Sequence, residues 1–79
     1  MDYLKHITRD PSVMGGEAVM TGTRVTLRTV LATLAEGAKV EEVVKSFPTL
    51  TPQAVYAAIA FAAASAQEDL PVPELRRAG

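Results

Sequence analysis

The chain has 79 residues, eight Lys/Arg against nine Asp/Glu, a net charge of −1 and no cysteine. One domain of this size buries only about 60% of its unfolded surface, so its core is expected to need support from a second copy. The missing cysteines exclude a disulfide framework and thiolate metal sites. The lack of a basic excess argues against strong binding of nucleic acid by a monomer.

The N-terminal part, residues 1–25, reads as short strands and turns. Leu4 to Thr8 alternates in the manner of a short strand, and Glu17 to Met20 has the character of a second one. The intervening Gly15-Gly16 allows a tight turn, and Thr21-Gly22-Thr23 predicts another. Two short strands are not stable alone, so we expect this segment to lie on a body of helices.

Two helices follow this segment. The first is predicted from Leu27 to about Ala35, because Thr26 is a good N-cap and Gly37 ends the apolar helical spacing. The second is predicted over residues 40–46, although its start is weak because Lys39 is a poor cap.

The third helix is the strongest prediction. Thr51 can cap it, Pro52 suits its first position, and the alanine-rich run continues to Gln67. Its apolar residues do not form a narrow stripe, so the helix is expected to be covered all round, by its own subunit and by a second copy. It is too short and too alanine-rich to read as a membrane span.

The fold class predicted is therefore mainly α: a three-helix, homeodomain-like helix-turn-helix bundle preceded by a short β-hairpin segment. Residues 1–67 would form the single domain, with strands and turns over 1–25 and helices over 27–67. Residues 68–79 contain two prolines and five charges without periodicity, and read as an extended tail. No signal-peptide pattern is present at the start, so a cytoplasmic address without a membrane partner is expected.

Several segments, in order, resemble a small bacterial family, that of domain of unknown function four hundred and thirty-three. The resemblance covers roughly Ile7 to Ala63 and is carried by Ile7, Asp10-Pro11, Val13-Met14-Gly15-Gly16, Val19-Met20, Gly22-Thr23-Arg24-Val25, Leu34-Ala35-Glu36-Gly37, Glu41-Glu42-Val43, Phe47-Pro48-Thr49-Leu50-Thr51 and Ala57 to Ala62. It implies a homeodomain-like fold. It also implies an antitoxin that dimerises, represses its own operon and blocks a nuclease toxin resembling the PIN domain.

The chain departs from this family pattern at three places. Glu17 stands where lysine is usual, Ala18 where proline is usual, and Lys39-Val40 replaces a serine-proline helix start. The charge reversal at Glu17 weakens any phosphate contact there.

If DNA is bound, the start of the third helix should enter the major groove. Gln53 could read adenine and Tyr56 could reach a phosphate, but the helix has no Lys or Arg. The remaining candidates are the cations of the N-terminal half, Lys5, Arg9, Arg24 and Arg28. The alternatives stay open that the helix is packing surface and that Arg24 only pairs with a carboxylate or with helix-end carbonyls.

Contacts with proteins are predicted at two other places. An arginine fork in the tail could bind the carboxylates of a PIN-like toxin, and the candidates there are Leu70, Val72, Leu75, Arg76 and Arg77. The candidates for a homodimer or higher homo-oligomer interface are Ile7, Val19, Val55, Ile59, Phe61 and Ala62.

No catalytic constellation is found. His6 is the only histidine, without a nucleophile and orienting acid at recognisable spacing, and one histidine without cysteine cannot hold zinc. Gly15-Gly16 lacks the lysine and strand-to-helix context of a phosphate loop. We therefore expect a non-enzyme without cofactor. It would be an antitoxin that neutralises a PIN-like ribonuclease, with operator DNA as a further partner, or else a small obligate-dimer interaction module that does not bind DNA.

Overall fold

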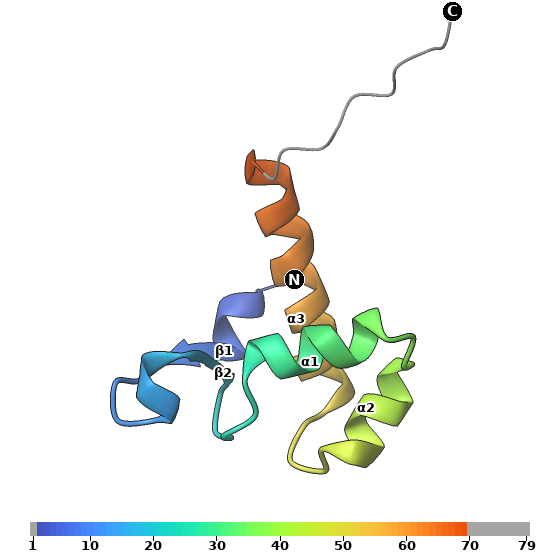
Figure 1. Cartoon of the computed structure of the whole chain (residues 1–79), viewed down its shortest axis with the longest axis horizontal. Coiled ribbons are helices and arrows are strands. Elements are labelled where there is room, and N and C mark those ends of the chain that lie inside the picture. Colours follow the sequence, from blue (N-terminus) through green and yellow to red (C-terminus); the bar gives the residue numbers. More distant parts are fainter. Residues whose placement is uncertain (1, 70–79) are drawn as a thin grey trace, which may run out of the picture.

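The structure, a computed structural model, describes residues 2–69 (Figure 1). Two short strands and two 3-10 turns precede three helices. In chain order these are η1 (Tyr3–Lys5), β1 (Ile7–Arg9), η2 (Met14–Gly16), β2 (Ala18–Met20), α1 (Leu27–Ala35), α2 (Val40–Ser46) and α3 (Pro52–Asp69). The expected fold, three helices behind an N-terminal hairpin, is confirmed.

The strands form an antiparallel hairpin in which Ile7 pairs with Met20 and Arg9 with Ala18. The first strand begins three residues later than predicted, because Tyr3–Lys5 form a 3-10 turn. The ring of Tyr3 meets that of Phe61 on α3 edge-on, with centroids 5.8 Å apart. This contact places the start of the chain against α3. The connection between the strands turns at Gly15 and Gly16, which have φ of 65° and 84°, as a tight glycine turn requires.

The helix boundaries follow local capping. The Thr26 hydroxyl accepts the backbone N–H of Thr29 at 3.1 Å and starts α1, and the chain leaves this helix at Gly37, where φ is 103°. The start of α2, which was expected to be weak, is stabilised by a side chain from within the helix and not by the N-cap residue. The Glu42 carboxylate accepts the backbone N–H of Lys39 at 2.9 Å, which is the reciprocal half of a capping box.

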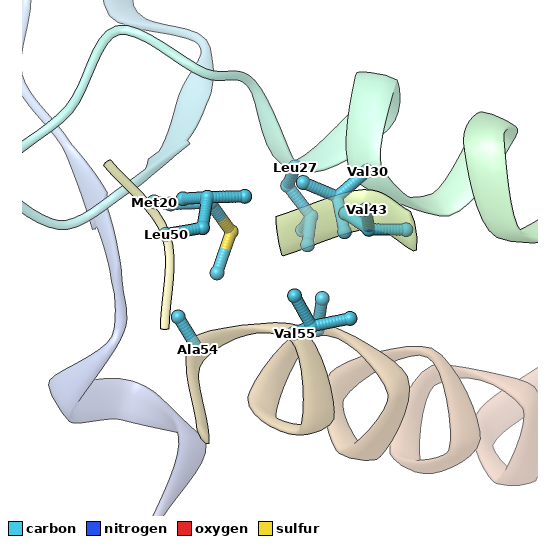
Figure 2. Packing of buried hydrophobic residues seen from close by; sticks show 8 residues of the cluster. Met20, Leu27, Val30, Val43, Leu50, Ala54 and Val55 are labelled. Carbon is cyan, nitrogen blue, oxygen red and sulfur yellow. The ribbon is translucent and has the colours of Figure 1, made fainter. Parts of the chain in front are cut away.

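The core lies where the hairpin and the first two helices meet the first turns of α3 (Figure 2). Its fully buried side chains come from every one of these parts. The buried residues of this core cluster are Met20, Leu27, Val30, Val43, Leu50, Ala54, Val55 and Ala58. Because each helix and β2 supplies at least one member, the bundle and the hairpin form a single packed unit.

Helix α3 is thereby divided into two parts. Its base, residues 52–58, contains the four positions that the rest of the subunit buries, Ala54, Val55, Ala57 and Ala58. Its upper part, residues 59–69, extends away from the body (orange to red in Figure 1) and is at most half-buried, as at Phe61. One subunit therefore covers only part of α3, and the expected covering of the remainder by a second copy stays a prediction. The helix also ends at Asp69 rather than Gln67, so the boundary predicted at residue 68 falls inside it.

Candidate functional site

The outer side of α3 presents two of the predicted contact residues to solvent. The Thr51 hydroxyl accepts the N–H of Ala54 at 3.2 Å and fixes the first turn. Ala54 and Val55 then point into the core, which leaves Gln53 and Tyr56 on the outside, Tyr56 with 52% of its surface exposed. Ile59, one turn further on, is 40% exposed. Since α3 has no charged residue before Glu68, this outer side is uncharged, and Tyr56 and Ile59 are the large apolar residues that it exposes.

The six predicted interface residues separate into interior and surface positions. Val19 and Val55 are buried within the subunit, at 4% and 0% exposure, so their assignment to an interface is wrong. Their alternation and helical spacing direct them to the core. Ile7 and Phe61 are half-buried and pack against this core, and Phe61 also meets Tyr3. Ala62 is half-buried, which leaves Ile59 as the most exposed candidate.

A hollow of about 370 Å³ lies between the hairpin and α1. It is lined by Arg9, Glu17, Ala18, Leu27, Arg28 and Leu31. The Nη2 atom of Arg28 lies 3.2 Å from a carboxylate oxygen of Glu17. Arg9 donates from Nη1 to the carbonyl oxygen of Gly16 at 3.2 Å. We call this feature the hairpin hollow.

The hairpin hollow combines charges of both signs with an apolar floor. Two guanidinium groups and one carboxylate surround Ala18, Leu27 and Leu31. The Arg28 side chain is 78% exposed, so its pair with Glu17 is screened by water and leaves the guanidinium accessible. Such a site suits a short peptide that carries a carboxylate beside an apolar side chain. A polyanion would be repelled by the negative charge of Glu17.

The six predicted DNA contacts do not form one surface around this hollow. Among them Arg9 and Arg28 line it, whereas Lys5 on η1 and Arg24 before α1 are exposed elsewhere, and Gln53 and Tyr56 lie on α3. Within the described side chains Arg24 has neither an ion pair nor a hydrogen bond, so the pairing considered for it is not observed there.

The hairpin hollow itself was not predicted from the sequence. One signal was present, the acidic Glu17 at a position where the resemblance described above implies lysine. Nothing in the spacing indicated that Arg28, eleven residues on, would lie beside it.

Asp10 is held by the turn that it begins. Its Oδ1 accepts the backbone N–H of Ser12 at 2.9 Å and the Ser12 hydroxyl at 2.7 Å. These two bonds, the backbone one foremost, lower the pKa of the Asp10 carboxyl, because they favour its ionised form. The carboxylate is therefore engaged in building the hairpin turn.

The part of the chain described here contains no group of three His, Cys, Asp or Glu side chains placed to hold a metal ion. None of its helices combines the length and the hydropathy that crossing a bilayer requires. The predicted toxin contacts, Leu70, Val72, Leu75, Arg76 and Arg77, lie outside the described residues.

Taken together, the fold defines a small helical protein with an N-terminal hairpin and a projecting third helix. The chain belongs to the family described as protein of unknown function (DUF433), whose model matches residues 7–62. A crystal structure of a DUF433 member protein from Anabaena variabilis superposes with a TM-score of 0.69 at 27% identity, over 85% of this chain and 70% of that one.

A curated relative, uncharacterized protein y4eO from Sinorhizobium fredii, is 34% identical over 59 residues. That match includes 75% of this chain but only 27% of the relative. The chain therefore spans about a quarter of the length of that protein.

Proposed function

We propose that this chain is the antitoxin of a toxin–antitoxin pair, that it neutralises a PIN-like ribonuclease by direct binding, and that it represses its own operon as a DNA-binding dimer. The observation that carries the proposal is the outer side of α3. Tyr56 and Ile59 stand exposed on a helix without a charged side chain from Pro52 to Gln67. The exposure of these two large side chains on an uncharged helix supports contact with a protein partner. The family resemblance supplies the nature of that partner.

For the toxin, the proposed contact is the C-terminal segment with its paired Arg76 and Arg77. A PIN-like nuclease holds its metal with clustered carboxylates, and a guanidinium can bind a carboxylate through two parallel hydrogen bonds. Insertion of the two arginines would neutralise the cluster and displace the metal ion. The ribonuclease would then lose its activity without being unfolded.

This proposal is tested by co-expressing the chain with the product of a PIN-like reading frame next to its own gene. Growth should be rescued by the full chain and lost when Pro71 to Gly79 are removed. Replacing Arg76 and Arg77 by alanine should also abolish rescue, whereas replacing Lys5 and Arg9 by alanine, which removes the same charge, should not. Rescue that survives removal of the segment would overturn the tail mechanism, and the absence of a PIN-like neighbour would overturn the toxin assignment.

For DNA, the proposed reader is the start of α3, where Gln53 and Tyr56 are exposed. Binding would need cations from two copies, because affinity for DNA comes largely from phosphate neutralisation. A labelled fragment from upstream of the gene should be retarded at about 50 mM salt and released at about 200 mM. Gln53→Ala should weaken this complex by about 1–3 kcal/mol if Gln53 reads a base. No retardation at the lower salt concentration would remove the DNA function.

The second candidate, an obligate-dimer interaction module without DNA binding, is favoured by the same uncharged α3. Under this alternative the chain dimerises and no upstream fragment is bound at either salt concentration. The retardation experiment therefore separates the two functions directly.

A further inference from the structure

We propose that two copies of this chain pair through the outer side of α3, with the two helices antiparallel. The pairing surface consists of four exposed residues at intervals of three, four and three along the helix, Tyr56, Ile59, Ala63 and Ala66. This spacing is that of the contact positions of a coiled coil, and it places all four on one side of the helix. The inference rests on the dimer that both candidate functions share. It adds which surface forms that dimer, and it leaves Gln53 as the DNA contact of α3 because Tyr56 is used for pairing.

The order of side-chain sizes along this surface determines the direction of the two helices. The two large side chains lie at its N-terminal end and the two alanines at its C-terminal end. In an antiparallel pair Tyr56 of one copy lies opposite Ala66 of the other, and Ile59 lies opposite Ala63. Each large side chain then has a small one opposite, so the space between the helices is filled along its whole length. In a parallel pair the large side chains would face each other and hold the alanines apart.

Charge and shape both permit this contact. Helix α3 has no charged residue from Pro52 to Gln67, so two identical surfaces can meet across a two-fold axis without like charges opposing each other. The opposed helix dipoles favour the antiparallel direction. At about 100° per residue, the buried Ala54 and Ala58 lie on the opposite side of the helix from Tyr56. Since the upper part of α3 extends away from the body, its outer side is free to lie along the base of a second α3 (Figure 1).

The absence of cysteine from the chain makes the direction testable. Full-length Tyr56→Cys protein is mixed with full-length Ala66→Cys protein, one of them isotope-labelled, and oxidised in air. A disulfide needs Cα atoms within about 7 Å, whereas the two copies of position 56 in the antiparallel pair are roughly 15 Å apart along the axis. Mass spectrometry should therefore find several-fold more disulfide between the two variants than between identical chains. A random mixture, an excess of disulfides between identical chains, or no disulfide at all would overturn the antiparallel pairing.

An exchange of side-chain sizes tests the contact itself. Ile59→Ala removes a large side chain, and Ala63→Ile places two isoleucines opposite each other. Each change should weaken dimerisation at least about tenfold, as measured by sedimentation equilibrium. The double variant Ile59→Ala, Ala63→Ile again has one large and one small side chain at each contact, so it should recover most of the lost affinity. A double variant as weak as Ile59→Ala alone would overturn the size match.

Ser65→Ile provides the matched control, because position 65 is exposed on the opposite side of α3 from Tyr56. This change should leave dimerisation as it is, and circular dichroism should show the same helix content for every variant. If both single changes at positions 59 and 63 left dimerisation intact, the dimer would use another surface. That result would overturn this inference and leave the proposed function standing, since toxin rescue and DNA retardation are measured separately.

Discussion

The two parts of α3 share one composition and have different surroundings. In the base, Val55, Ala57 and Ala58 are fully buried against α1, α2 and the hairpin. In the upper part, Ala63 and Ala66 are exposed although they are the same residue type as their neighbours below. The difference is made by what lies beside the helix, since both parts are alanine-rich and uncharged up to Gln67.

This contrast separates helix formation from burial. Alanine enters a helix without loss of side-chain entropy, so α3 can continue to Asp69 beyond the body that covers its base. The base contributes to the stability of the subunit. In the upper part, Phe61 still packs against the core and Tyr3, whereas the exposed residues Ala63 and Ala66 contribute little to that stability and remain available to a partner.

The largest effect is expected from a charge placed in the base. Val55→Asp would bury an unpaired carboxylate at a position with no exposed surface, and should lower the free energy of unfolding by more than about 4 kcal/mol. A small domain has only about 5–15 kcal/mol of stability, so this substitution should remove a large fraction of it. Urea titration followed by circular dichroism measures this loss.

The matched control is Ile59→Asp, the same charge one turn further along α3. Its side chain is partly in solvent, so the free energy of unfolding should change by less than about 1 kcal/mol. Light scattering should show a smaller mass for this variant if the outer side of α3 joins two copies. Equal destabilisation by the two aspartates would remove the distinction between base and outer side.

A smaller effect is expected where η1 meets the upper part of α3. Phe61→Ala removes a half-buried ring that contacts Tyr3, and should cost about 2 kcal/mol, below the 3–5 kcal/mol of a fully buried phenylalanine. A double-mutant cycle with Tyr3→Ala should give a coupling of about 1 kcal/mol.

Tyr56→Ala, which removes an exposed ring from the same helix, should cost less than about 0.5 kcal/mol. If Phe61→Ala were as mild as Tyr56→Ala, the N-terminal turn would not be fastened to α3 through this pair.

Local signals made most of the fold predictable. Thr26, Gly37 and Pro52 mark helix ends through capping and backbone preferences that act within a few residues. The position of β1 was less predictable, because Tyr3 turns onto Phe61, a partner 58 residues away. The alternation of residue types from Leu4 to Thr8 gives no indication of that contact.

The candidate site was less accessible to sequence reasoning than the fold. Gln53 and Tyr56 were selected because the first turns of a recognition helix face the major groove, and both side chains are exposed in the structure. Val19 and Val55 were misplaced because composition gives hydrophobicity without saying which neighbour covers it. The hairpin hollow depends on the packing of β2 against α1, a tertiary relation that brings Glu17 to Arg28.

The smallest effect is expected from lowering the pH, which should affect the hairpin turn and leave α3 unchanged. The Ser12 bonds lower the pKa of Asp10, so their contribution is present above the pKa of the unfolded chain and is lost as pH falls through the lowered value. Ser12→Ala removes the hydroxyl donor and keeps the stronger backbone one, so the pKa of Asp10 should rise part of the way to its usual value. Carboxyl carbon chemical shifts measure it. Because α3 has no carboxylate from Pro52 to Gln67, its amide signals should not follow this titration. Signals from its base that moved together with Asp10 would show that the turn and the helix are coupled through the core.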